Sequence, residues 1–298
     1  MKFGLNFFPS FRPSDLSTAA YFDQVLRMCE RADQLGYRSV KAVEHYFHDY
    51  GGQTPNPVVL LSAIAARTRR LRLITGAVIP AFNHPVKLAG ELAMLDNVSS
   101  GRLDVGFGRA FIPKEFEVFG ISMDESRARF EEGIDIITRL WTEDRVTYEG
   151  KFHRFNDVHS TPRPVQKPHP PIWVGGMPGV ISAPAVRRVA LLCDAWHPLG
   201  LSLDDVEKGI ATIRQMAAKA GRRDELKFAP RNLLNLTPDA KGRGRASFEG
   251  SPDEVAADIR RARGLGVDYL TFDMPKLDVP GMVRTIERFV KDVKPAAA

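Results

Sequence analysis

The chain has 298 residues, of which 44% are hydrophobic and 26% are charged, and its net charge is +6. These values are typical of a globular protein with a full core, and no apolar run reaches the roughly 20 residues needed to span a bilayer. Lysines and arginines are scattered, and the cluster at residues 241–245 is spaced by glycines. The charge therefore fits an anionic small ligand better than nucleic acid.

The sequence contains two cysteines, Cys29 and Cys193, which lie far apart in apolar, helix-like segments. A pair this sparse predicts small buried side chains and no disulfide framework, as in a reducing compartment. The N-terminal residues lack a small-residue cleavage site, and we interpret them as a first strand. We therefore expect a cytoplasmic protein with no membrane partner.

Short β-branched or aromatic runs alternate with longer segments of helical periodicity along the whole chain. The predicted strands begin at residues 2, 39, 70, 102, 171, 194, 227 and 267. The predicted helices cover residues 19–36, 57–70, 85–101, 126–141, 184–193, 204–221, 252–266 and 282–293. Gly36 ends the first helix, and Ser251 with Glu254 predicts a capping box at the start of the seventh.

Eight strand–helix units without a break in composition predict a (β/α)8 TIM barrel, with residues 1–298 as one domain. A six-stranded doubly wound sheet is the alternative. Residues 143–169 interrupt the rhythm with prolines and no clear helix, so we interpret them as an insertion after the fourth helix. We expect this insertion and the loop at 241–245 to wall the substrate cavity.

Candidate catalytic residues follow from the rule that such barrels carry their chemistry at the carboxyl ends of the strands. Glu44 and His45 end the second strand, and a histidine there can exchange a proton near neutral pH. A histidine that only satisfies hydrogen bonds in the core is the alternative. The seven histidines show no metal-binding spacing, so no metal ligand is predicted.

A candidate anion site follows the fifth strand. Gly175 and Gly176 come directly after this strand, and Ser182 could cap the next helix. Backbone N–H groups at a helix start attract phosphate, although a plain cap with a glycine turn is equally open.

Arginines near the fourth strand could complete the anion site. Arg109 lies just past this strand and Arg127 opens the next helix, and a guanidinium suits phosphate because its planar fork donates two bonds. Each could instead be a surface charge. Arg129 competes with Arg127 for the role, or pairs with Glu131 or Glu132.

Taken in order, these segments resemble the bacterial-luciferase-like superfamily of FMN-dependent monooxygenases and deazaflavin-dependent oxidoreductases. The resemblance runs nearly from end to end. It is most specific over residues 44–120, in EHYF, NPVVLLSAIAARTRRLRLITGAVIP and NHPVKLAGELAMLDNVSSGRLDVGFGRAFIPKEFEVFG. It continues in SRARFEEGIDIITRLWTE, PPIWVGG and SPDEVAADIRRARGLGVD.

The resemblance implies roles for the residues around the second and third strands. His45 matches the catalytic histidine in EHxF, which lies near the flavin C4a position and supports a hydroperoxide intermediate. Glu44 helps to shape the flavin site. Gly76 and Ala77 lie where the family has a non-prolyl cis peptide beneath the flavin ring.

The resemblance also implies a phosphate site. Arg109 and Arg127 match arginines that hold the FMN phosphate. Gly175, Gly176 and Ser182 match the phosphate loop, which the residues MPGVI make longer than usual. The luciferase α chain has a reactive cysteine where this chain has a glycine at position 108, so luciferase itself is not implied.

The implied activity is that of the oxygenase in a two-component monooxygenase. A separate flavin reductase supplies reduced FMN, which reacts with O2, and a small organic substrate undergoes Baeyer–Villiger insertion or hydroxylation. EHYF and GFGRA differ from the DHxxP and GxGxGE motifs typical of deazaflavin members, which favours FMN. A deazaflavin-dependent oxidoreductase and a non-catalytic flavin-binding protein are the alternatives. The resemblance further implies a homodimer formed through the second and third helices.

Overall fold

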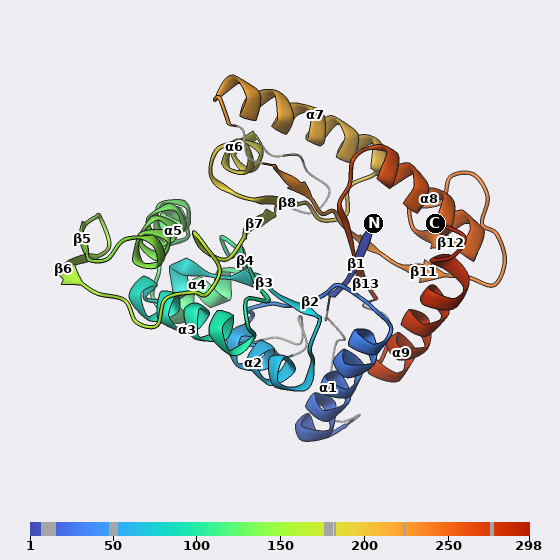
Figure 1. Ribbon diagram of the computed structural model, residues 1–298, viewed down its shortest axis with the longest axis horizontal. Coiled ribbons are helices and arrows are strands. Elements are labelled where there is room, and N and C mark those ends of the chain that lie inside the picture. The colour runs from blue at the N-terminus through green and yellow to red at the C-terminus, as the bar shows by residue number, and fades with distance from the viewer. Residues whose placement is uncertain (7–15, 48–52, 176–180, 182, 223–224, 275–276) are drawn as a thin grey trace.

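The computed structural model of the chain describes residues 1–6, 16–47, 53–175, 181, 183–222, 225–274 and 277–298. In this part of the chain, parallel strands lie at the centre and helices surround them (Figure 1). The main sheet has nine strands in the order β10-β13-β1-β2-β3-β4-β7-β8-β9. They are β1 (Lys2–Asn6), β2 (Ser39–Ala42), β3 (Arg72–Val78), β4 (Leu103–Phe107), β7 (Ile172–Gly175), β8 (Ala195–His197), β9 (Lys227–Phe228), β10 (Arg231–Leu233) and β13 (Tyr269–Asp273).

The sheet closes into a barrel because β9 and β10 are two parts of one strand. The backbone N–H groups of Ala229 and Arg231 donate to carbonyls of β8 and the segment after it. The carbonyls of Phe228 and Pro230 accept from β13 and the residue before it. This strand therefore pairs on both sides and completes the predicted (β/α)8 TIM barrel, and the doubly wound alternative is wrong.

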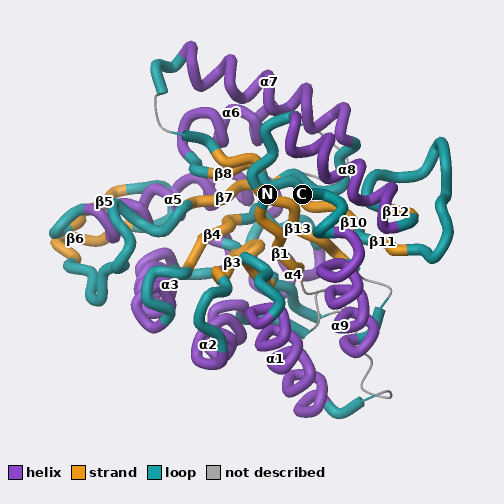
Figure 2. The backbone as a smooth tube through the Cα atoms, turned by 45° about the vertical axis from the view of Figure 1, so that its right-hand side comes forward, coloured by secondary structure: helices purple, strands orange, loops and turns teal. Residues whose placement is uncertain are grey.

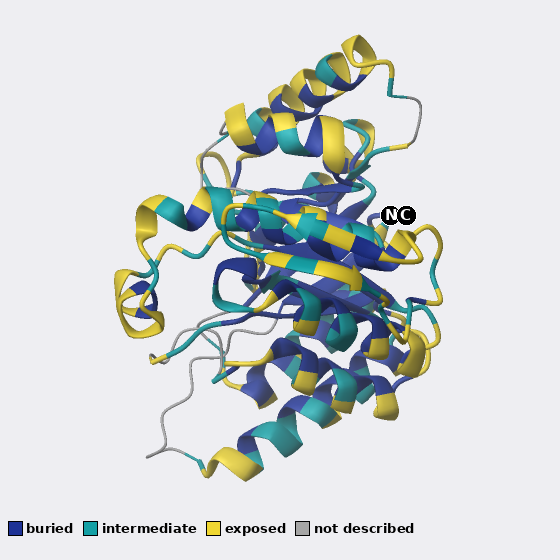
Figure 3. Ribbon diagram, turned by 90° about the vertical axis from the view of Figure 1, so that its left-hand side faces the viewer, coloured by how far each residue is buried: buried dark blue, intermediate teal, exposed yellow. Residues whose placement is uncertain are grey.

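Helices cover the outside of the barrel and bury their apolar side against the strands, while their outer side is exposed (Figure 3). The eight predicted helices are present as α1 (Thr18–Gln34), α2 (Pro57–Arg67), α3 (Pro85–Val98), α5 (Ser126–Thr142), α6 (Ala183–Leu192), α7 (Leu203–Lys219), α8 (Pro252–Gly264) and α9 (Val279–Arg288), which a π-helical turn (Phe289–Val293) extends. The predicted capping box of Ser251 and Glu254 is confirmed at the start of α8. Among the described residues, no helix combines the length and the apolar character that crossing a membrane requires.

Several elements have no counterpart in the sequence prediction. A short helix, α4 (Pro113–Phe119), follows β4, and the 3-10 turns Pro80–Phe82 and Met123–Glu125 follow β3 and α4. The insertion at 143–169 contains an antiparallel hairpin of β5 (Val146–Glu149) and β6 (Arg154–Val158). A small parallel ladder joins β11 (Asn235–Leu236) to β12 (Glu249–Gly250).

The insertion follows α5, the fourth of the predicted helices, and it is more regular than its sequence suggests. Figure 2 shows the hairpin at the periphery of the molecule beside α5. The carboxylate of Glu132 on α5 accepts from the backbone N–H groups of Lys151, Phe152 and His153 at distances of 2.8–3.2 Å. A carboxylate that accepts several N–H groups fixes a tight turn, so the hairpin is anchored to α5.

The inner face of the barrel changes from apolar to polar toward the carboxyl ends of the strands. Ile74, Trp173, Ala195, Ala229 and Tyr269 form a buried apolar layer. Farther along the strands, inward positions carry the residues that we call the polar layer: Asn6, Lys41, His197, Arg231 and Asp273. Four of these are at least 92% buried, and the side chain of Arg231 is 11% exposed. Alternation along each strand places these side chains inside the barrel.

Candidate active site

A cavity of about 440 Å³ opens at the carboxyl ends of the barrel strands. This is the face where barrels of this type carry their chemistry. Six of the residues predicted from the sequence line this cavity: Glu44, His45, Gly76, Ala77, Arg109 and Gly175. Arg127 is not among the lining residues, and Gly176 and Ser182 lie outside the described residues.

One wall of the cavity is bare backbone. The peptide bond between Gly76 and Ala77 is cis, as the resemblance implied. A Cβ on Gly76 would lie 2.0 Å from Cδ of Lys41, and a Cβ on Gly106 would lie 2.1 Å from the carbonyl oxygen of Thr75. Larger residues are therefore excluded at both positions, and the backbone presents a surface that a flat ring can approach closely.

Glu44 holds this wall to the end of β2. Its carboxylate is buried and accepts from the Tyr46 hydroxyl at 2.6 Å, from Asn83 Nδ2 at 2.9 Å and from the Ile79 N–H at 2.8 Å. Burial raises the pKa of Glu44, although these three hydrogen bonds act in the opposite direction. Both oxygens are engaged, so the geometry gives Glu44 a positioning role.

His45 is oriented by a carboxylate that the sequence analysis did not single out. Its Nδ1 lies 3.3 Å from Oε1 of Glu115, and the same oxygen accepts from the Tyr46 N–H at 2.8 Å. Glu115 is 1% exposed, and the ring of Phe111 meets the His45 ring edge-on at 5.9 Å. A proton on Nδ1 that faces Glu115 leaves Nε2 as the ring nitrogen suited to proton exchange.

Glu115 could have been found from the sequence by its place in a helix start. It lies two residues after Pro113, the first residue of α4. Proline at the first helical position and an acidic residue in the first turn are typical of a helix N-terminus. The helix has only seven residues, which is too short for apolar periodicity to reveal it.

Three arginines gather beside the cavity, and we call Arg109, Arg127 and Arg188 the arginine cluster. Arg188 on α6 lines the cavity, and its Nε and Nη1 are buried without a hydrogen-bond partner in the described part of the chain. Burial lowers the pKa of Arg188, Glu131 raises it, and the charges of Arg109 and Arg127 lower it further. Nη1 forms only a long ion pair with Glu131, at 3.7 Å. A partly buried guanidinium with donors that form no hydrogen bond and two like charges nearby favours an anionic ligand.

Arg127 and Arg129 have different partners in the structure. Arg127 forms an exposed ion pair with Glu131 at 3.0 Å and is close enough to act on Arg188. Arg129 pairs with Glu125, at 2.9 Å, and its guanidinium lies 4.2 Å from the ring centre of Phe152 in the hairpin. The predicted pairing of Arg129 with Glu131 or Glu132 is therefore wrong, and Arg127 is the one that belongs to the cluster.

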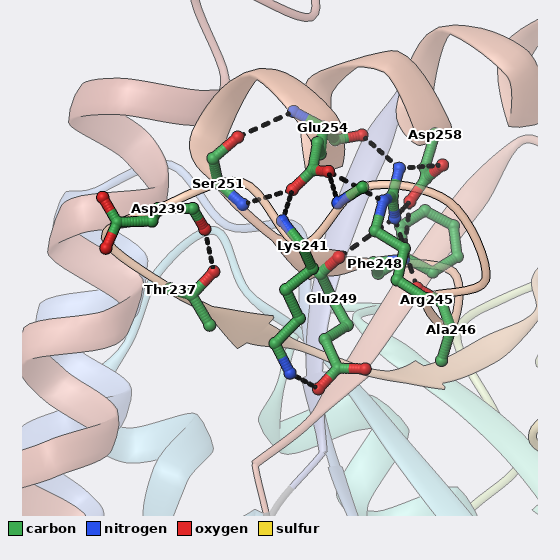
Figure 4. Close-up of polar contacts among 11 residues, drawn as sticks. Thr237, Asp239, Lys241, Arg245, Ala246, Phe248, Glu249, Ser251, Glu254 and Asp258 are labelled. Carbon is green, nitrogen blue, oxygen red and sulfur yellow. Dashed lines mark hydrogen bonds and ion pairs between the residues drawn. The ribbon is translucent and has the colours of Figure 1, made fainter.

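The prediction that residues 143–169 and 241–245 wall the cavity is wrong. No residue of either segment, all of which the structure describes, lines it. Gln166 of the insertion binds the carbonyl of Leu103, at the opposite end of β4 from the cavity, at 2.6 Å. The loop at 241–245 is tied to α8, where Arg245 forms a bidentate pair with Asp258 at 2.6 and 3.0 Å (Figure 4).

The same loop supports a prediction on acid stability. Backbone N–H groups of Lys241, Ser251 and Gly242 donate to the Glu254 carboxylate and lower its pKa from 4.5 to about 2 (Figure 4). Because the pKa falls on folding, this carboxylate stabilises the fold above its unfolded value, and the contribution is lost as the pH drops toward 2. We expect Glu254→Gln to lower the melting temperature at pH 7, and the difference from wild type to shrink below pH 4.5.

Circular dichroism melts at stepped pH values would measure this difference. Glu149→Gln, which removes an exposed pair with Arg154, is the matched control and should change little. A difference for Glu254→Gln that stays constant down to the acid limit would contradict the prediction.

Comparison with known proteins agrees with this geometry. Residues 1–234 match the model of the luciferase-like monooxygenase family. The crystal structure of monooxygenase RslO1 from Streptomyces bottropensis is 40% identical, with a TM-score of 0.87 and full coverage of both chains. The oxygenase component of the flavin-dependent trigonelline monooxygenase from Acinetobacter baylyi is 38% identical over 177 residues, or 58% of this chain and 48% of that protein.

A second curated relative is the FMNH2-dependent dimethylsulfone monooxygenase of Pseudomonas putida. It is 30% identical over 200 residues, or 65% of this chain and 53% of that protein. The chain thus spans about half the length of these curated relatives. Its family is shown by the match over residues 1–234 and by the full-length likeness to the Streptomyces enzyme: the chain belongs to the luciferase-like monooxygenases.

Proposed function

We propose that this protein is the oxygenase of a two-component monooxygenase. It takes reduced FMN from a separate flavin reductase and uses O2 to oxygenate a small organic substrate. The observation that carries the proposal is a single cavity lined by both His45 and Arg188. A proton-exchanging group and phosphate-binding charge in one cavity suit a ligand with a reactive ring and a phosphate. The names of the trigonelline and dimethylsulfone relatives support the same class of reaction.

The residues present fit FMN. In this proposal the arginine cluster and the backbone at Gly175 hold the phosphate, and Gly176 and Ser182, which lie outside the described residues, contribute to the same binding. The backbone at Gly76 and Ala77 supports the ring. The unused donors of Arg188 are what a phosphate would satisfy. When bound, FMN supplies the chemistry that activates O2.

The protein's own contribution is a dry site and a positioned proton. Apolar side chains that line the cavity include Phe107, Phe116 and Phe130, all of which are buried. They exclude water, which strengthens electrostatic interactions inside the site. His45, held by Glu115, exchanges a proton with the reacting groups through Nε2, and Glu44 keeps the end of β2 in place.

Anaerobic titration tests the cofactor, and product analysis tests the reaction. We expect the protein to bind reduced FMN and not a reduced deazaflavin. With a flavin reductase, labelled O2 and a substrate panel, we expect one labelled oxygen atom in the product, whose structure distinguishes Baeyer–Villiger insertion from hydroxylation. Binding of deazaflavin alone would support the hydride-transfer alternative. Flavin binding with release of peroxide and no product from any substrate would support a binding protein.

A homodimer through α2 and α3 is part of this proposal. The two neighbouring helices expose apolar side chains, with Val59 68%, Met94 57% and Val98 61% exposed. Apolar groups this exposed on adjacent helices suit a subunit interface. We expect light scattering to give the mass of a dimer, and Met94→Glu to give a monomer. Leu192→Glu on α6, which is 71% exposed, is the control and should stay dimeric. A monomeric wild-type protein at micromolar concentration would end this part of the proposal.

Cys29 and Cys193 are both buried and unpaired. Burial raises the pKa of the Cys193 thiol to about 12, so it stays protonated and unreactive. This fits small core side chains in a reducing compartment, and a cytoplasmic location stays part of the proposal, to be checked by cell fractionation.

A further inference from the structure

The polar layer beneath the cavity contains a lysine that is held by a histidine. Nζ of Lys41 lies 2.8 Å from Nε2 of His197, whose Nδ1 lies 2.5 Å from the carbonyl oxygen of Ala229. Because a carbonyl can only accept, His197 carries its proton on Nδ1 and its Nε2 accepts from Lys41. An amine has two N–H groups and an ammonium has three, so Lys41 keeps at least one donor beyond the bond to His197.

The lysine side chain lies directly beneath the bare backbone wall. A Cβ built on Gly76 would meet Cδ, Cγ and Cε of Lys41 at 2.0, 2.3 and 2.7 Å. The methylene groups therefore support the peptide between Gly76 and Ala77 from below. Lys41, His197 and Arg231 also line the cavity, so the amine lies at its floor.

The one carboxylate of the polar layer, Asp273, is hydrogen-bonded to other residues and not to the Lys41 amine. Arg231 Nε binds Asp273 at 2.5 Å, and the second oxygen of Asp273 accepts from Asn6. Burial lowers the pKa of Lys41 well below its ordinary value, the charge of Arg231 lowers it further, and Asp273 only partly opposes this. The pKa of His197 is lowered by burial and then by Lys41 and Arg231, so His197 is neutral. A ligand that brings negative charge to the floor would stabilise the protonated lysine.

We propose that Lys41, positioned by His197, donates a hydrogen bond to the anionic edge of the reduced flavin ring, with Arg231 adding its charge from the same floor. This inference rests on the proposed function and extends it to selection between redox states. The oxidised ring is neutral, whereas the reduced ring is an anion once it has lost its own proton. A cation at the floor therefore favours the reduced form, and charge near the ring is one way in which a protein tunes a flavin.

Lys41→Met tests this inference because methionine keeps an unbranched chain under Gly76 and removes the amine. We expect the variant to bind reduced FMN at least about tenfold more weakly in anaerobic titrations, since hydrogen bonds to charged groups contribute about 1.5–3 kcal/mol. Affinity for oxidised FMN should stay within about twofold of wild type on the same reasoning, because the neutral ring makes no charged bond. If Lys41→Met loses tenfold in affinity for reduced FMN and none for oxidised FMN, the reduction potential of the bound flavin falls by about 30 mV, because the couple transfers two electrons. Lys87→Met on α3, whose side chain is 68% exposed, is the control.

Calorimetry adds a second readout. Above the pH at which the free reduced ring loses its proton, binding of the anion should raise the pKa of Lys41, and the wild-type protein should take up more protons than Lys41→Met. Oxidised FMN should cause no such difference.

The possible failures are distinguishable. No difference in proton uptake, or equal weakening of both redox states in Lys41→Met, would overturn the inference and leave the proposed function intact. A wild-type protein that binds neither form of FMN would overturn the proposed function itself.

Discussion

His45→Ala is expected to lower the rate of substrate oxygenation by a factor of about 10²–10⁴, the usual contribution of a positioned acid–base group. His45 lines the cavity, and its side chain is only 10% exposed. Alanine there removes the group proposed to exchange a proton with the reacting species, but it leaves the arginine cluster untouched. Affinity for reduced FMN should therefore change little, and its oxidation should release peroxide in place of product.

The ratio of product to peroxide per reduced FMN consumed measures this effect directly. His159→Ala in the insertion is a matched control, because this histidine is half-exposed and does not line the cavity. Glu115→Gln should give a smaller loss, since an amide keeps the size of the side chain but holds the His45 ring less firmly. Its pH profile should also shift, which a purely structural defect would not cause. A His45→Ala protein with the wild-type ratio would contradict the role assigned to this histidine.

The barrel could be predicted because its signals are local. The sequence repeats eight times a short apolar run, which marks a strand, and a segment with apolar spacing of three and four, which marks a helix. The helix caps lie within a few residues of the helix ends that they mark. The strand from residue 39 is nevertheless shorter than its apolar run suggests. The N–H of Glu44 bonds to Ala77 and that of His45 to Thr54, so the chain leaves the regular ladder after Ala42. Contacts of this kind join residues distant in the sequence, and periodicity does not report them.

The hairpin at 143–169 was missed for a related reason. In β6 no residue is fully buried, so its sequence lacks the alternation of apolar and polar residues that marks a half-buried strand. What fixes the hairpin is Glu132, on the preceding helix. The loop at 241–245 depends in the same way on Glu254 and Asp258 of α8. Composition indicated that both segments were irregular, but it carried no information about which side of the barrel they would cover.

The candidate site could be predicted in part. Glu44, His45 and Arg109 were found because the ends of barrel strands are recognisable in the sequence. Arg188 was not, because it lies inside a helical segment beside Arg187, and only the packing of α6 decides which of the two faces the cavity. Lys41 did leave a signal, since a lysine between apolar neighbours in a buried strand needs a partner.

Arg188 carries the second large expected effect. Arg188→Met should weaken FMN binding by about 10- to 100-fold, because a charge-assisted hydrogen bond contributes about 1.5–3 kcal/mol. Riboflavin, which lacks the phosphate, should bind both proteins alike. Arg187→Met is the matched control, since this neighbouring arginine is exposed and does not line the cavity. Fluorescence titration of the wild type and both variants with the two flavins measures these affinities, and equal loss for FMN and riboflavin in Arg188→Met would contradict phosphate binding by this residue.

Arg188→Met should weaken FMN binding but raise the thermal stability of the protein without flavin. The guanidinium of Arg188 is partly buried with unused donors, and an unsatisfied buried polar group costs about 1–3 kcal/mol. Methionine removes this cost, so Arg188→Met should melt at a higher temperature than wild type in the absence of FMN. Added FMN should then raise the melting temperature of the wild type more than that of the variant, because a ligand stabilises the folded state more when it binds more tightly. A variant that is less stable than wild type without flavin would indicate that Arg188 supports the fold, and thermal melts with and without FMN separate the two cases.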